Sequence, residues 1–190
     1  MKDFLRKMSF KKNRHDQLEI SDPHAMRALA HPVRLDLLAA LSAGPLTATQ
    51  CAERVGESPQ SCSYHLRTLA KHGFVEPAER GNGKERPWRK VARGLHWSGS
   101  DDTDAARALA GTFLARDFRL AQRYLAAPPA EWPEPMYAQA TLRLTPAEAR
   151  ELGEKIFALL EPYFPVTREE APEDAVDIWW ASFGVPSSDA

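Results

Sequence analysis

The sequence predicts a mainly α-helical fold with a small β component (α+β), and three observations support this. Residues 22–72 hold short helical patterns with capping residues, residues 74–92 hold two β-prone segments around a turn signal, and residues 104–125 form one long helical pattern. With 190 residues, the chain is long enough to bury a substantial core. We expect four regions: a basic N-terminal arm or helix (1–21), a compact domain (22–97), a long linker helix (98–127) and a small strand–helix–strand unit (128–190).

The composition is that of an ordinary globular protein, with 43% apolar and 27% charged residues. No segment approaches the roughly 20 consecutive apolar residues that span a bilayer, and the charged N-terminus lacks the apolar core of a secretory signal. The two cysteines, Cys51 and Cys62, are few enough for a reducing compartment. We therefore expect a cytoplasmic protein without a membrane partner.

The net charge of −1 conceals a strong asymmetry between the two halves of the chain. Residues 1–97 carry 17 basic and 10 acidic side chains, whereas residues 98–190 carry 8 basic and 16 acidic ones. A basic half suits contact with a polyanion, and an acidic half would stay away from it. Chance sorting of a few charges remains an alternative at this point.

Capping residues between positions 47 and 73 indicate two short helices joined by a tight turn. Thr47 can cap a helix that ends before Gly56. Ser58 and Pro59 are typical of the N-cap and first position of a second helix, which would continue to about His72. Gly73 then suits a left-handed C-cap. Two short helices around a glycine-containing turn are the helix-turn-helix pattern.

The second helix, residues 58–72, has two chemically different faces. At 100° per residue, Cys62, Leu66 and Leu69 fall on one arc with His65 beside them, and this face is expected to pack inward. The opposite face carries no acidic residue. Its members are amide, hydroxyl and cationic side chains of the kinds that read base edges in a major groove: Gln60, Tyr64, Arg67 and Lys71, flanked by Ser61, Ser63 and Thr68. A merely solvated helix face is the alternative.

A β-hairpin is predicted directly after this helix. Residues 74–77 and 87–92 are its expected strands, and Asn82-Gly83 between them is a strong turn signal because both residues tolerate positive φ. The loop at residues 80–86 is polar and basic, which suits a wing that lies along the DNA backbone or in the minor groove. Any exposed hairpin can carry basic residues, so an ordinary surface loop is the alternative.

Two segments resemble a known family. Residues 28–38 (ALAHPVRLDLL) and 63–75 (SYHLRTLAKHGFV) are similar to the opening helices, recognition helix and first wing strand of ArsR-type winged helix-turn-helix regulators. The resemblance covers about residues 22–95, and the remaining half is broadly similar to larger family members with an appended helix and α/β tail. It implies homodimerisation and operator binding. The expected DNA-binding residues are Ser58, Gln60, Ser61, Ser63, Tyr64, Arg67, Lys71, Arg80, Asn82, Lys84, Arg86 and Arg89.

The metal sites known in this family have no counterpart in the sequence. Its thiolate pair would fall at Thr47 and Thr49, which supply no thiolate, and no histidine follows His96 to build the site on its C-terminal helix. Cys51 and Cys62 fit small core residues better than ligands, and His65 fits a packed, hydrogen-bonded core position. We expect no metal and no other cofactor.

The long helix at residues 104–125 is expected to pair with its symmetry mate. Its apolar residues recur at near-helical spacing, and the expected dimer contacts are Leu109, Phe113, Leu120 and Tyr124. Packing of the same stripe within one chain is the alternative. In the C-terminal unit we predict strands at residues 136–144 and 175–183. Between them, the capping-box sequence at 145–148 opens a helix that runs to about Glu161.

The sequence therefore predicts a dimeric, sequence-specific regulator that binds double-stranded DNA. Two-fold symmetry implies a roughly palindromic site with half-sites about 34–36 Å apart. An enzyme is not expected, because phosphate-binding glycine loops, nucleophile elbows and zinc-protease motifs are missing from the sequence. Two other functions stay open: a winged helix that binds only protein, and a regulator that senses an unidentified small-molecule effector. Aromatic side chains that could line a pocket for an effector are Tyr124, Trp132, Trp179, Trp180 and Phe183.

Overall fold

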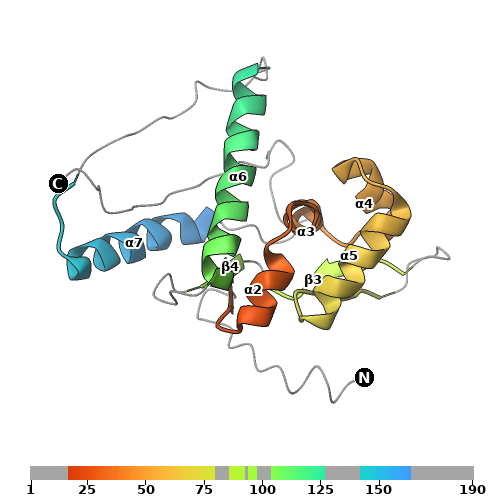
Figure 1. The fold of residues 1–190 in the computed structure, drawn as a ribbon, viewed down its shortest axis with the longest axis horizontal. Helices are drawn as coiled ribbons and strands as arrows, with labels where there is room; N and C mark the ends of the chain where they lie inside the picture. Colours follow the sequence, from red (N-terminus) through yellow and green to blue (C-terminus); the bar gives the residue numbers. More distant parts are fainter. Residues whose placement is uncertain (1–16, 80–85, 93, 98–103, 127–141, 164–190) are drawn as a thin grey trace.

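The computed structural model describes residues 17–79, 86–92, 94–97, 104–126 and 142–163. Within these ranges the chain is mostly helical, with two small two-stranded sheets, which confirms the predicted fold class (Figure 1). The helices of the described ranges include none with the length and apolar character needed to cross a membrane.

The first helices form the base on which the later ones pack. Strand β1 (Gln17–Glu19) leads into α2 (Pro23–Leu29), where the Asp22 side chain accepts a hydrogen bond from the backbone N–H of His24. Helix α3 (Pro32–Ala40) follows at once and tightens into a short 3-10 helix (Leu41–Ala43). Proline in the first turn of both α-helices costs no hydrogen bond, because those N–H groups have no partner within a helix.

The predicted helix-turn-helix is confirmed as α4 (Ala48–Val55) and α5 (Pro59–Lys71). Thr47 and Gln50 form a reciprocal capping box at the start of α4, with hydrogen bonds of 3.2 and 2.8 Å. The chain leaves α4 through Gly56, whose φ of 78° lies in the left-handed region that glycine adopts most cheaply. Ser58 then caps α5 by accepting from the N–H of Ser61.

The two predicted wing strands are also present. Strand β2 (Val75–Pro77) pairs antiparallel with β3 (Trp88–Lys90), so that Val75 lies opposite Lys90 and Pro77 opposite Trp88. The backbones of Trp88 and Leu46 exchange two further hydrogen bonds, which fix the hairpin to the segment before α4. The Asn82-Gly83 turn lies outside the described residues and stays a prediction.

The sequence did not predict the second sheet. Strand β4 (Gly94–His96) pairs parallel with β1, with Leu18 opposite Leu95. Each strand has only three residues, too few to show an alternating pattern. The pairing closes the N-terminal end of the described chain against the segment that follows the wing.

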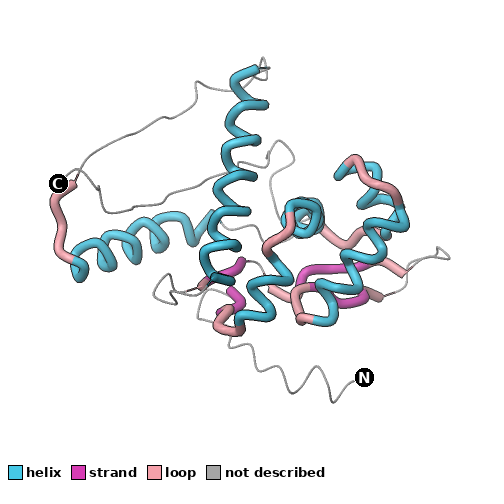
Figure 2. The backbone as a smooth tube through the Cα atoms, viewed as in Figure 1, coloured by secondary structure: helices cyan, strands magenta, loops and turns pink. Residues whose placement is uncertain are grey.

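The long helix and the helix after it agree with the prediction. Helix α6 (Asp104–Ala126) packs chiefly on α2 and also meets α3, rising beyond them as a rod (Figure 2). Helix α7 (Pro146–Leu160) starts at a second capping box, between Thr145 and Glu148, and is followed by a 3-10 helix (Glu161–Tyr163).

The strand predicted over 136–144 is wrong at its end. Residues 142–144 belong to no strand and are exposed, so they lack the buried face that a sheet strand would need. Residues 136–141 and the predicted strand at 175–183 lie outside the described residues, as do the basic N-terminal segment 1–16 and the aromatic residues Trp132, Trp179, Trp180 and Phe183.

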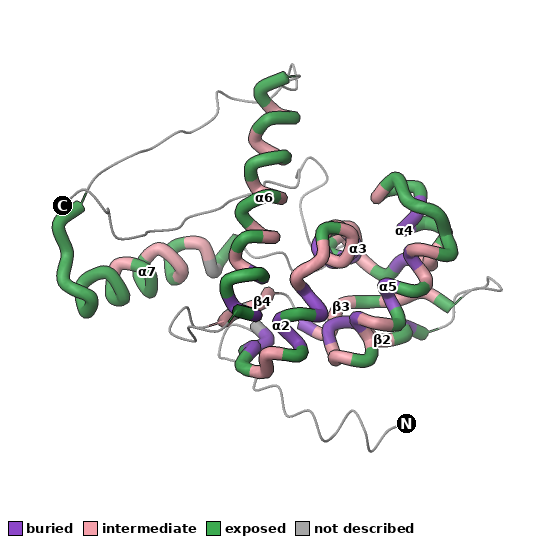
Figure 3. The backbone as a smooth tube through the Cα atoms, in the orientation of Figure 1, coloured by how far each residue is buried: buried purple, intermediate pink, exposed green. Residues whose placement is uncertain are grey.

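The hydrophobic core lies where α2, α3, α5 and the start of α6 meet; exposure increases along α6, and α7 has no buried residue (Figure 3). Its largest fully buried side chains include Phe74, Met26 and Leu109. Leu109 therefore joins α6 to the same core that supports α5. This shared core holds α5 by its inner face.

Candidate nucleic-acid interface

Helix α5 is anchored by its inner face, as the sequence predicts. Cys62, Leu66 and Leu69 are fully buried, and α5 packs against α4, α3 and α2. Burial raises the pKa of the Cys62 thiol, and it raises that of Cys51 to about 11, so both stay as neutral thiols. Neither forms a disulfide, which agrees with their interpretation as small core residues.

The outer face of α5 presents the predicted polar side chains to solvent. Gln60, Arg67 and Lys71 are exposed, and Tyr64 is 64% exposed although its ring is large and partly apolar. Ser61 and Ser63 are half-buried at the edges of this face. Within the described ranges, neither Arg67 nor Lys71 forms an ion pair. Their charges are available to an anionic partner.

Two hydroxyl groups near this face are already used by the helix itself. The Ser58 Oγ accepts the cap hydrogen bond from Ser61, and the Thr68 hydroxyl donates to the Tyr64 carbonyl oxygen at 3.1 Å. Ser58 was predicted to contact DNA; in the structure its side chain forms the N-cap of α5. Loss of such a cap typically costs about 1 kcal/mol.

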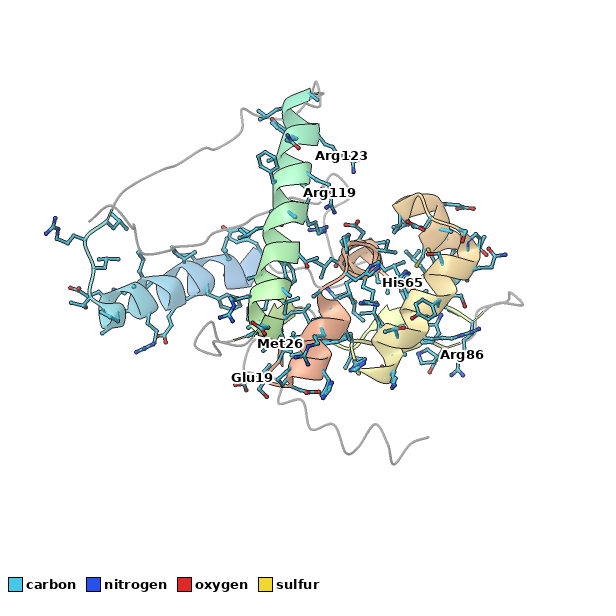
Figure 4. The ribbon with its side chains drawn as sticks, in the orientation of Figure 1. Glu19, Met26, His65, Arg86, Arg119 and Arg123 are labelled. Carbon is cyan, nitrogen blue, oxygen red and sulfur yellow. The ribbon has the colours of Figure 1, made fainter. Side chains whose placement is uncertain are left out.

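A pair of histidines supports α5 from below. His65, labelled in Figure 4, has its ring centroid 4.5 Å from that of His31, which precedes Pro32 at the start of α3. Burial, followed by the charge of Arg34, lowers the pKa of His31; for His65, burial comes first and His31 and Arg34 add to it. The packed position predicted for His65 is confirmed. Its Nδ1 and that of His31 find no hydrogen-bond partner among the described residues, so hydrogen bonding at that nitrogen is not observed.

The described part of the wing divides its basic residues into two kinds. Arg86 is exposed, with Nε donating weakly to the Ala78 carbonyl oxygen at 3.4 Å. Arg89 instead forms a 2.7 Å ion pair with Glu76 across the hairpin, so its charge is partly neutralised. This pair was not predicted from the sequence, although oppositely charged residues directly opposite each other in a hairpin often pair. Arg80, Asn82 and Lys84 lie outside the described residues.

Lys90 is a further basic residue of the wing, and no role was predicted for it from the sequence. Its Nζ donates to the Ser42 hydroxyl at 3.1 Å and so connects β3 to the 3-10 helix after α3. Burial lowers the pKa of Lys90 to about 8. Lys90 therefore supports the wing from its inner side and is poorly placed to reach a nucleic acid.

The residues predicted to form a dimer contact occupy an inward face of α6. Leu109 is fully buried in the core of its own chain, and the Phe113 ring stacks on Trp97 with centroids 4.9 Å apart. Leu120 lines a surface cavity, and Tyr124 is half-buried. Leu109 and Phe113 therefore pack within their own chain, which is the alternative to a dimer contact for this stripe.

Comparison with known proteins supports the same assignment of elements. A family model described as a helix-turn-helix domain matches residues 29–78, which run from the last residue of α2 to the residue after β2. A search of curated proteins gave no significant match. The chain therefore carries a helix-turn-helix domain, and with β2 and β3 beside it the domain has the winged form.

Two solved structures are similar to part of this chain. One is the homodimeric winged helix-turn-helix DNA-binding domain of a possible ArsR-family regulator from Mycobacterium bovis, with 27% identity over 51% of this chain and 79% of that chain, and a TM-score of 0.34. Another is an ArsR-like transcriptional regulator from Rhodococcus sp. RHA1, with 27% identity over 55% of this chain and 90% of that chain, and a TM-score of 0.32.

Proposed function

We propose that the protein is a sequence-specific, double-stranded DNA-binding transcriptional regulator that acts as a homodimer. The observation that carries this proposal is the exposed, acid-free face of α5, which stands on a rigid, fully buried inner face. A helix that was only solvated would gain from Glu–Lys pairs on its surface, and this face has none. Its side chains are those that hydrogen-bond to base edges and phosphates.

Each side chain of the outer face has a contact that suits its chemistry. Arg67 can form two hydrogen bonds to the O6 and N7 atoms of a guanine, and Gln60 can do the same with the N6 and N7 atoms of an adenine. Tyr64 offers a hydroxyl and an apolar ring, and Lys71, at the end of the helix, suits a phosphate. Ser61 and Ser63, at the edges of the face, complete the proposed contacts.

In this proposal the wing adds affinity without reading sequence. Arg86, together with Arg80 and Lys84 of the loop, contacts phosphates or the minor groove. Asn82 of the same loop is included among the proposed DNA contacts. Arg89 contributes less than the sequence suggested, because its pair with Glu76 would have to open before it could bind a phosphate.

The homodimer is proposed to form through α6. Leu114, Phe118 and Leu125 of this helix are 45%, 64% and 73% exposed, and at 100° per residue they fall within an arc of about 40°. Three large apolar side chains on one exposed face of a helix are typical of an interface. The four residues predicted from the sequence lie on a different face of the helix, centred about 130° away. Leu109 of that face is buried, whereas Phe113, Leu120 and Tyr124 are half-buried and retain some surface.

The dimer is tested by placing a charge on each of two faces of α6. We expect Phe118→Glu to convert the dimer to a monomer in multi-angle light scattering, because the charge would be desolvated in the interface. Ala108→Glu introduces the same group at an exposed position on another face of the helix and is expected to leave the dimer intact. A protein that is monomeric before mutation, or a Phe118→Glu variant that stays dimeric, contradicts this interface.

DNA binding is tested by selecting bound duplexes from a random pool and titrating the enriched sequence with salt. We expect an inverted repeat, with affinity that falls steeply as salt rises. Weak binding without enrichment would contradict the proposal and favour the other function considered, a winged helix that binds only protein. The same selection with Arg67→Ala provides the matched variant for base reading.

A further inference from the structure

We propose that a surface cavity between α3, α4 and α6 binds a small anionic effector, a compound with one carboxylate or phosphate group joined to an apolar body. The cavity has a volume of about 370 Å³, which is within the range of small-molecule sites. Its lining combines cationic side chains with small apolar ones: Asp36, Ala39, Ala40, Ala43, Arg54, Val55, Arg116, Arg119, Leu120 and Arg123.

The charge of this lining is strongly unbalanced. The residues that line the cavity include four arginines and one carboxylate, that of Asp36. Arg116 Nε donates to Asp36 Oδ1 at 3.0 Å, and Arg119 Nη2 lies 3.7 Å from Asp36 Oδ2. Asp117 Oδ1 adds a longer contact, 3.9 Å from Arg116 Nη1. Two carboxylates cannot neutralise four guanidinium groups, so an excess positive charge faces the cavity.

Two of the arginines have no acidic partner in the described part of the chain. Arg54, in the last turn of α4, donates from Nη1 to the Ala40 carbonyl oxygen at 3.3 Å, which orients its guanidinium without neutralising it. Arg123 forms no ion pair there, and it projects from α6 on the side that faces α3, as Arg119 does (Figure 4). The planar fork of such a group fits a carboxylate or phosphate with two parallel hydrogen bonds.

Asp36 has a positioning role in this arrangement. Its carboxylate holds Arg116, whose side chain is only 17% exposed, against α3. This half-buried pair holds one wall of the cavity in place, whereas Arg119 is 46% exposed and able to turn toward a bound anion. Removal of Arg116 or Asp36 would take from a half-buried charge its shortest ion pair, the 3.0 Å contact, and would disturb the packing of α6 on α3. Arg119 and Arg123 are therefore the better residues to mutate.

The apolar residues of the lining define the rest of the ligand. Ala39, Ala40 and Ala43 come from α3 and the 3-10 helix, and Val55 and Leu120 come from α4 and α6. Contact with these side chains removes water, which strengthens the attraction between the arginines and an anion. Inorganic phosphate would use only the cationic part, so an anion with an apolar body should bind more tightly.

The location of the cavity suggests what binding would do, and this step rests on the proposed function. Arg54 belongs to the helix-turn-helix, whereas Arg119 and Arg123 belong to the helix proposed to form the dimer. An anion that bridges them would fix the angle between the reading helix and the dimer axis. It changes DNA affinity only to the extent that it binds the DNA-bound and free arrangements differently.

The ligand site is tested without DNA, so that the result does not depend on the proposed DNA-binding function. Phenyl phosphate is titrated into the full chain by calorimetry, with phenol and inorganic phosphate as comparison ligands. We expect saturable binding of phenyl phosphate, weaker binding of inorganic phosphate and none of phenol. The double variant Arg119→Ala/Arg123→Ala should weaken phenyl phosphate binding at least tenfold, Arg123→Lys less so, and Arg150→Ala, a matched loss of one exposed arginine on α7, should leave it unchanged.

Several outcomes would overturn the proposal. Absence of phenyl phosphate binding, or equal binding to the double variant, excludes the site. If the double variant loses DNA affinity while the original chain binds no phenyl phosphate, the arginines contact DNA phosphates instead. If it loses only dimerisation, they contact acidic residues of a second copy. If phenyl phosphate binds as expected but leaves DNA affinity unaltered, the site is real and its proposed regulatory effect is wrong.

Discussion

Replacement of Arg67 by alanine gives the sharpest test of base reading by α5. Arg67 is exposed on the outer face of the helix and has no ion pair among the described residues, so its removal should change the free energy of unfolding by no more than about 0.5 kcal/mol. An altered DNA affinity can then be assigned to a lost contact and not to a misfolded domain. Arg150→Ala provides the matched control, because it removes one exposed arginine from α7, far along the chain.

The size of the effect follows from the number of contacts. A side chain that reads a base typically contributes about 1–3 kcal/mol, which corresponds to about 5- to 160-fold in affinity per half-site. A dimer presents Arg67 twice, so the loss on a symmetric site can approach the square of that factor. The loss should also be confined to one base position in each half-site, because alanine no longer distinguishes the base there.

The assay is fluorescence anisotropy with the enriched duplex and a set of duplexes that each change one base pair symmetrically. For the original protein, one of these changes should cost as much as Arg67→Ala does, and for the variant that same change should cost almost nothing. An equal loss of affinity on every duplex, scrambled DNA included, would mean that Arg67 binds a phosphate. The proposed division between α5 and the wing would then be refuted.

The remaining predictions concern the wing, a helix cap and a buried amine. Lys84→Ala should weaken binding to all sequences alike and reduce the salt slope by about one; a loss limited to certain sequences would contradict a phosphate contact. Thr47→Ala removes the hydrogen bond to the Gln50 N–H and should lower the free energy of unfolding in urea by about 1 kcal/mol, whereas an unchanged midpoint would show that the cap is dispensable. Lys90 should titrate near pH 8 by NMR, while an unfolded lysine keeps its proton to about pH 10.4. Stability should therefore rise from about pH 8 to 10.4 in the original protein, and this rise should be lost in Lys90→Met.

Local signals explain why the helix-turn-helix could be predicted from the sequence. The capping box at Thr47, the left-handed Gly56 and the Ser58-Pro59 start are each determined by residues within four positions of one another. The inner face of α5 follows from helical periodicity alone, since Cys62 and Leu66 can reach the core only from one side. The residues of α5 that do not belong to this inner face are then expected to be exposed. These elements needed no knowledge of the tertiary structure.

What the sequence could not predict depends on contacts between distant segments. The pairing of β1 with β4 joins Leu18 to Leu95, and the ion pair between Asp36 and Arg116 spans 80 positions. Periodicity identified the apolar stripe of α6 but not its partner, because a stripe that packs within the chain looks the same as one that pairs with a second copy. Leu109 is seen to pack within its own chain only when the tertiary structure places α2 beside α6.

Three faces of α6 can connect the core beneath α5, the proposed dimer interface and the proposed ligand site. Leu109 ties its base to the core beneath α5, Leu114 and Phe118 lie on its exposed apolar face, and Arg119 and Arg123 face the cavity. At 100° per residue, the arginines lie roughly opposite the apolar face. A second copy and a bound anion would therefore not compete for the same surface. An effector in the cavity could change how the dimer presents its reading helices while the dimer itself remains intact.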